Sequence, residues 1–552
     1  MFIRIKISPH NPKKKNVQIV ESVREGNKVK QVVVRHVGVA LNDNELRRMK
    51  DLAEYIKAQI EFEHTPSLFS PEEIAKEAIA ARKRKDDEKE LRVDLKKLEE
   101  EQRINIGFQE IYGKIYDELF DKVLTSRHGE SADEILKNIV IARTANPQSK
   151  RASTRLLEED FGIRINLDKV YRMMDKLDDN TAQSIQKKAY QTALTLFDNK
   201  IDVIFFDATT LYFESFIEDE LKQNGFSKDH KFNQSQVVLS LMVTKEGLPL
   251  GYDVFPGSTY EGTTLITALE KIKKQYKIDK VVFVADAGML QEKNLTLLEE
   301  NGYEYIISAR LKNLSKPWKK EVLSQTFEEE KIKDLSFNEQ RRLILYHSNE
   351  RAKKANKDRE KAVKKLLKKL NKNKNPLSLI SNYGYKKYIK TKGKTEIEID
   401  EAKLQEDEKW DGLCGIFTNS KEMHKEDIIK HYKGLWQVEE SFRITKHDLK
   451  IRPIYHWSPD RIKAHIAITF MAFCCIRLLE YRIKTQSTKL SPNEIRHALG
   501  KLELSILKEP SGQRYVLPSK YTKEAKQIYQ IMGIKASSVP YKLNSSKPKF
   551  NK

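Results

Sequence analysis

Two short runs of apolar residues constrain the fold of this 552-residue chain more than any other feature of its sequence. Residues 201–207 and 281–286 consist almost entirely of β-branched, aromatic and other apolar residues, with little alternation between apolar and polar positions. A strand of that composition is buried on both faces, which occurs where helices cover both sides of a sheet. The sequence therefore predicts an α/β protein built on a central sheet.

The neighbouring segments make that sheet a mixed one. Strand patterns at 236–244 and 248–255 are separated by the turn Lys245-Glu246-Gly247, which predicts an antiparallel hairpin. A helical pattern at 263–276 and a strand pattern at 303–308 follow. A strand pattern at 413–417 could rejoin the sheet after a long interruption.

Changes in composition divide the chain into five parts. We expect an N-terminal β-meander with a helix, a mainly helical region that could bind DNA, a catalytic core in two segments, an insertion within it, and a C-terminal helical region with a polar tail. Their bounds are 1–60, 61–200, 201–310 with 413–480, 311–412, and 481–552.

The charge of the chain favours a polyanionic partner. Lys and Arg number 102 against 80 Asp and Glu, a net charge of +22, which suits nucleic acid or an acidic membrane surface. Residues 351–374 are especially basic, and they form either a solvated helix or a surface for phosphates. Short helices around 134–177 predict either a helix-turn-helix, with Lys150, Arg151 and Arg155 at DNA phosphates, or an ordinary bundle.

The sequence argues against disulfide frameworks, zinc sites, a membrane span and a signal peptide. The three cysteines, Cys414, Cys474 and Cys475, have no spacing typical of disulfide frameworks or zinc sites. The apolar run 464–476 is shorter than the ~20 residues that cross a bilayer, so we expect a buried core helix. The alternating N-terminal residues do not resemble a signal peptide. These features predict a cytoplasmic protein with no membrane partner.

Two aspartates follow the two apolar strands. Asp207 and Asp286 stand where each apolar run stops, and ligands of open α/β sheets bind at this edge. Their carboxylate oxygens suit hard cations such as Mg²⁺. The alternative for either residue is an ordinary turn or helix cap.

A third acidic candidate lies on a helix expected over 424–449. At about 100° per residue, Glu439 falls in the same stripe as Tyr432, Leu435 and Trp436, which should face the sheet. A carboxylate there is costly unless it is paired or bound to metal. An ion pair with Lys446 or Arg443 would satisfy it without any metal, whereas the neighbouring Glu440 can reach solvent more easily.

Three motifs together resemble bacterial insertion-sequence transposases of the DDE class. They are FDATTLYFE at 206–214, VADAGM at 284–289 and YKGLWQVEESFRITK at 432–446. The last resembles the group with a Tyr-x2-Arg-x3-Glu-x6-Lys signature, in which Tyr432, Glu439 and Lys446 match and Leu435 stands where the group has arginine.

The resemblance implies a ribonuclease-H-like mixed-sheet core in which Asp207, Asp286 and Glu439 are catalytic and hold Mg²⁺ or Mn²⁺, with two ions per site. It implies cleavage at the terminal inverted repeats of the element, joining of the 3′-hydroxyls to double-stranded target DNA, and a homodimer synapsed on DNA. Tyr432, Arg443 and Lys446 would contact DNA. The alternatives are a catalytically inactive DNA-binding protein of this fold and a metal-dependent nuclease without strand transfer.

Overall fold

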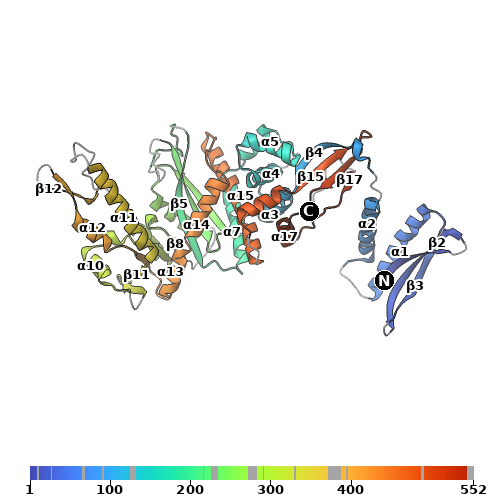
Figure 1. Ribbon diagram of the computed structural model, residues 1–552, viewed down its shortest axis with the longest axis horizontal. Coiled ribbons are helices and arrows are strands. Elements are labelled where there is room, and N and C mark those ends of the chain that lie inside the picture. Colours follow the sequence, from blue (N-terminus) through green and yellow to red (C-terminus); the bar gives the residue numbers. More distant parts are fainter. Residues whose placement is uncertain are drawn as a thin grey trace. The chain divides into compact units, whose positions relative to one another are not determined.

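The structure is a computed structural model, and it forms two compact units (Figure 1). One contains Met1–Ile104, Glu503–Lys520 and the described residues from Ala536 onward, and the other contains Asn105–Leu502 and Tyr521–Lys535. The described residues are 1–8, 11–25, 28–64, 69–89, 93–124, 132–214, 217–225, 234–271, 282–289, 291–327, 331–370, 387–392, 396–486 and 490–543. The polar tail predicted from residue 544 and residues 371–374 of the basic stretch lie outside them.

The first unit contains the predicted β-meander. Strands β1 (Phe2–Ser8), β2 (Asn11–Glu25) and β3 (Lys28–Ala40) pair antiparallel in that order, and α1 (Asp43–His64) follows. Helix α2 (Pro71–Lys89) is capped by Ser70, whose hydroxyl accepts from the Glu73 amide while the Glu73 carboxylate accepts from the Ser70 amide.

A second sheet of this unit joins segments from both ends of the chain. Its strand order is β17 (Tyr541–Leu543), β16 (Arg514–Pro518), β15 (Glu503–Lys508) and β4 (Glu99–Asn105). The sequence suggests only helices after residue 481, and these strands were not anticipated because each is short and pairs with distant segments.

The second unit has a helical part around α15 (Pro459–Thr485). Helices α3, α4 and α7 pack against α15. Although α15 has the length and composition of a membrane span, 94% of its apolar window is buried inside the protein, which confirms the predicted core helix. The surrounding helices are α3 (Gly107–Phe120), α4 (Ala132–Ala145), α5 (Lys150–Phe161), α6 (Leu167–Met174), α7 (Asp179–Leu196), α16 (Pro492–Gly500) and α17 (Lys523–Ile531).

The rest of this unit is built on an eight-stranded mixed sheet, ordered β10-β11-β14-β9-β8-β5-β6-β7. Strand β8 is parallel to β5 and β9, and the other neighbours are antiparallel. This confirms the mixed α/β class, the hairpin closed by Gly247 at φ +82°, and the return of β14 to the sheet. The bounds are β5 (Val203–Tyr212), β6 (Gln236–Thr244), β7 (Pro249–Pro256), β8 (Val282–Ala285), β9 (Glu304–Ser308), β10 (Ile332–Ser336), β11 (Arg342–His347) and β14 (Leu413–Thr418).

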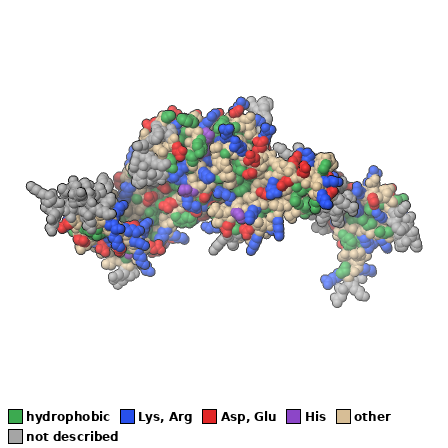
Figure 2. Space-filling view, turned by 45° about the horizontal axis from the view of Figure 1, so that its top comes forward, with side chains coloured by type: hydrophobic (Ala, Val, Ile, Leu, Met, Phe, Trp, Pro, Cys, Tyr) green, Lys and Arg blue, Asp and Glu red, His purple; other side chains and the backbone are tan. Residues whose placement is uncertain are grey.

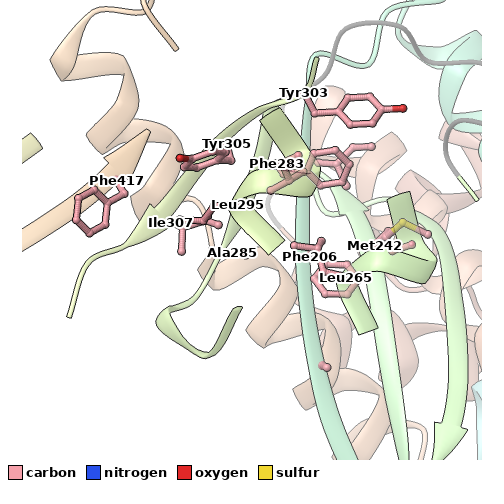
Figure 3. Close-up of a cluster of buried hydrophobic side chains, with 14 of the residues drawn as sticks. Phe206, Met242, Leu265, Phe283, Ala285, Leu295, Tyr303, Tyr305, Ile307 and Phe417 are labelled. Atoms are coloured by element: carbon pink, nitrogen blue, oxygen red, sulfur yellow. The ribbon is translucent and has the colours of Figure 1, made fainter. Parts of the chain in front are cut away.

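One face of the sheet carries the main apolar core. Phe206 of β5 and Phe283 and Ala285 of β8 are fully buried in it (Figure 3). Helices α7, α8 (Thr264–Lys271) and α9 (Glu292–Glu300) contribute to the same cluster. Because side chains alternate along a strand, the residues between these core positions point to the opposite face.

The insertion is only partly separate from the sheet. Its strands β10 and β11 extend the sheet beyond β14. The other elements are α10 (Lys316–Ser324), α11 (Asn349–Leu370), the hairpin of β12 (Ile389–Lys392) and β13 (Glu396–Ile399), and α12 (Glu401–Glu408). Basic side chains are spread widely across the face seen in Figure 2, so the positive charge is not confined to α11.

Candidate functional site

Asp207 and Asp286 lie side by side on adjacent parallel strands. The register pairs Phe206 of β5 with Ala285 of β8, so the next residue on each strand is an aspartate. Since Phe206 and Ala285 belong to the apolar core, both aspartates point to the opposite face of the sheet. Asp207 is half-buried and Asp286 is exposed.

The sequence placed both aspartates at strand ends, and this is right only for Asp286. Strand β8 ends at Ala285, immediately before Asp286. Strand β5 continues past Asp207 to Tyr212 because β6 pairs with it along that whole length. Asp207 is therefore held in the middle of a strand, where its backbone is fixed on the β6 side.

The single helix predicted over 424–449 is broken in three. Helix α13 (Lys425–Lys433) ends at Gly434, α14 (Trp436–Arg443) follows, and a π-helical turn η8 covers Ile444–Asp448. A Cβ on Gly434 would lie 2.7 Å from the Phe205 ring, so only glycine allows this close approach to β5. Angles calculated for a continuous helix do not carry across the break.

The break changes which residues face the sheet. Leu435 is buried, as predicted, but Trp436 is 52% exposed and Glu439 is exposed as well, so their predicted place in a buried stripe is wrong. The proposed ion pairs of Glu439 are also absent from the described structure. Arg443 pairs with Glu440 at 3.2 Å and Asp448 at 3.7 Å instead.

Glu440 is the more enclosed of the two adjacent glutamates. Besides Arg443, its carboxylate lies 3.9 Å from the Arg477 guanidinium of α15. Arg477 in turn donates to the Gly247 carbonyl and pairs with Glu480 at 2.8 Å. Glu440 thus belongs to a structural network that ties α14 to α15, while Glu439 is accessible from solvent.

Segment 434–446 crosses the face of the sheet that carries the aspartates. Gly434 packs on Phe205, and Lys446 Nζ donates to Thr209 Oγ1 at 2.6 Å. Phe205 and Thr209 lie two positions either side of Asp207 and share its face. Glu439 lies between the two contacts along the chain. Among the described residues, however, no three His, Cys, Asp or Glu side chains are close enough to hold one metal ion, so Glu439 does not join the aspartates in this structure.

Tyr432 lies near Asp286. Burial raises the pKa of its hydroxyl, a hydrogen bond with Ser308 lowers it, and the negative charge of Asp286 raises it further. The Arg351 guanidinium, from the start of α11, lowers the same pKa. Tyr432 therefore connects the end of β9 and the insertion to the aspartate face.

A hollow of about 360 Å³ opens beside Tyr432. It is lined by Tyr346, His347, Ser348, Glu350, Arg351, Tyr432, Lys433 and Leu435. The sequence reasoning missed this hollow, because Arg351 could be seen only as one member of a basic run. The sequence feature that could have pointed to this hollow is Leu435, which stands where the signature has arginine.

The candidate DNA contacts on α5 divide into two kinds. Lys150 is 3% exposed and lies 3.4 Å from the His465 ring, and its burial lowers its pKa well below the usual value. The prediction that Lys150 meets a phosphate is therefore wrong for this structure. Arg151 and Arg155 are exposed near the N-terminus of α5, where the helix dipole also favours anions.

The donor set suits a hard divalent cation. Asp207 and Asp286 supply acceptor oxygens from adjacent positions, and Asp286 is open to solvent. Both aspartates could hold one ion directly, whereas Glu439 would have to approach them by a side-chain or helix movement.

Comparison with known proteins gives a family and several remote structural matches. The family described as Transposase DDE domain matches residues 198–475, which include Asp207, Asp286 and Glu439. No curated protein matches the sequence. Among solved structures, a piggyBac transposase synaptic complex with hairpin DNA matches at 9% identity and TM-score 0.37, covering 72% of this chain and 79% of that one. A Mos1 transposase paired-end complex matches at 14% identity and TM-score 0.14, covering 33% and 61%.

Proposed function

Because this chain belongs to the family of transposases with a DDE domain, we propose that it cuts the inverted-repeat ends of a bacterial insertion sequence and joins the freed 3′-hydroxyls to target DNA. The observation that carries the proposal is the pairing of Asp207 with Asp286 on one sheet face, which the helix bearing Glu439 crosses. The mixed sheet is proposed to be a ribonuclease-H-like core.

Asp207, Asp286 and Glu439 are proposed to hold Mg²⁺ or Mn²⁺, with two ions per site. When bound, the ions stabilise the attacking and leaving oxygens of an in-line displacement at phosphorus. The protein supplies Asp207 and Asp286 from adjacent strands of the sheet, and Glu439 would supply the third carboxylate from α14. No covalent bond between protein and DNA is needed.

The basic and hydroxyl groups around the aspartates would position the DNA strand. Lys446 is held against β5 by Thr209, and Tyr432 is held by Ser308 beside Asp286. Arg443 is half exposed and can reach DNA only while its pairs with Glu440 and Asp448 loosen. Synapsis of two element ends on a homodimer would place one such site at each end.

The test is product analysis with the purified full chain. It is incubated with Mg²⁺, a labelled duplex ending in the inverted repeat and a supercoiled target plasmid. We expect both cut ends and joined donor–target molecules. Cut ends alone would make the protein a nuclease without strand transfer, and repeat binding with neither product would make it an inactive DNA-binding protein.

The surface of α5 gives a separate prediction about DNA affinity. Replacing both Arg151 and Arg155 by alanine should weaken repeat binding and reduce the slope of log affinity against log salt by about 2, because each phosphate contact contributes about 1. Lys150→Met, which replaces a buried residue, should leave the slope unchanged. Fluorescence anisotropy across a salt series measures both. Equal slopes in the unmodified chain, the double arginine variant and Lys150→Met would show that the DNA does not bind at Arg151 and Arg155.

A further inference from the structure

The hollow beside Tyr432 is basic. Arg351 and Lys433 contribute full positive charges, and His347 is exposed at its rim. Lys433 Nζ lies 6.0 Å from the centre of the Tyr346 ring. Glu350 is the one acidic side chain in the lining, so the hollow keeps a net positive charge. A binding site of this composition favours an anion.

Arg351 is held without neutralising its charge. Its Nη1 donates to Cys414 Sγ at 3.4 Å, and the Tyr346 and Tyr432 hydroxyls are its other neighbours. No carboxylate among the described residues pairs with it. Arg359, two turns along the same helix, is different: both its terminal nitrogens bind the Asp411 carboxylate, at 2.8 and 2.6 Å. Arg351 therefore retains donors and charge for a ligand.

The hollow is linked to the aspartate face through one side chain. The hydroxyl of Tyr432 interacts with the Arg351 guanidinium, the Ser308 hydroxyl and the charge of Asp286. An anion bound by Arg351 would therefore lie next to the site where the scissile phosphate is expected. In a DNA strand, the nearest such anion is a phosphate flanking the scissile one.

The residue at position 435 indicates a role for Arg351. Leu435 stands at the signature position where the group that the sequence resembles has arginine, and its buried apolar side chain cannot bind a phosphate. Leu435 and Arg351 nevertheless line the same hollow. We propose that Arg351, from the insertion, binds a DNA phosphate there and replaces the arginine missing from position 435. The planar guanidinium suits two parallel hydrogen bonds to phosphate oxygens. This inference rests on the proposed function.

Removing the arginine at position 351 and introducing one at position 435 tests the proposal. Arg351→Ala should lower the cleavage rate at subsaturating DNA by about 10-fold to 100-fold, the range for loss of a charge-assisted pair of hydrogen bonds. Adding Leu435→Arg to Arg351→Ala should restore at least half of the lost rate, because Leu435, just before α14, lines the same hollow. Lys320→Ala, which changes an exposed residue on α10 outside the hollow, serves as the control and should cleave like the unmodified chain.

The outcomes separate this proposal from the proposed function. Failure of the proposed function appears in the unmodified chain, which would then cut no DNA. Failure of this proposal appears only in the variants: normal cleavage by Arg351→Ala, or no rescue by Leu435→Arg in a protein with an unchanged melting temperature, would overturn it. If Arg351→Ala does not fold, Arg351→Lys is used, with a smaller expected loss and the same rescue by Leu435→Arg, because lysine keeps the charge but lacks the two-pronged donor.

Discussion

Replacing Asp207 or Asp286 by asparagine is expected to lower the rate of strand cleavage by about 10²-fold to 10³-fold or more, the loss typical of removing one stabilising group from an active site. Asparagine keeps the shape of the side chain but removes its charge, and a neutral amide is a much weaker partner for a divalent cation than a carboxylate. Repeat binding should persist, since removing negative charge beside DNA does not weaken attraction to phosphate.

Single-turnover cleavage of an end-labelled repeat duplex measures the first effect, and anisotropy on the same duplex measures the second. Asp202→Asn is the matched control, because Asp202 is exposed just before β5 and lies away from Asp286 in the register. Cleavage at the normal rate by both the Asp207 and Asp286 variants would show that this face of the sheet takes no part in cleavage. A loss confined to one of them would show that the two carboxylates do not share a task.

The sequence was informative where structure depends on local pattern. The apolar runs predicted β5 and β8, the turn at Gly247 predicted a hairpin, and the length of the run 464–476 predicted a core helix. The two aspartates could be selected because each follows an apolar run, and their pairing then depends on the register of β5 with β8. Burial on both faces leaves a strong signal in composition, so these features can be read without coordinates.

The errors arose where distant segments meet. The continuation of β5 past Asp207 depends on pairing with β6, and Gly434, where the helix breaks, packs against the ring of Phe205, 229 positions earlier in the chain. Lys150 is buried beside His465, and their separation of 315 residues leaves no trace in local pattern. Each of these contacts is a tertiary effect that overrides helix propensity or charge.

The second large effect is expected from substitutions at Glu439 and Glu440, which should change different properties: the first lowers cleavage and the second lowers stability. Glu439→Gln is expected to lower cleavage by about 10²-fold to 10³-fold, as for the aspartates, with no change in stability, because its side chain is exposed and pairs with no described residue. Glu440→Gln should keep most of the cleavage activity but lower the free energy of unfolding by about 1 kcal/mol, because it weakens the pairs with Arg443 and Arg477.

Thermal or denaturant unfolding and the same cleavage assay distinguish the two effects in one set of proteins. The comparison also tests whether α14 moves. In the structure Glu439 does not reach the aspartates, so a large loss on Glu439→Gln requires the DNA-bound state to bring its carboxylate toward β5 and β8. If Glu439→Gln cleaves normally and Glu440→Gln does not, the third carboxylate is Glu440, and its network with Arg477 must open when DNA binds. If both variants cleave normally, catalysis depends on the two aspartates without either glutamate.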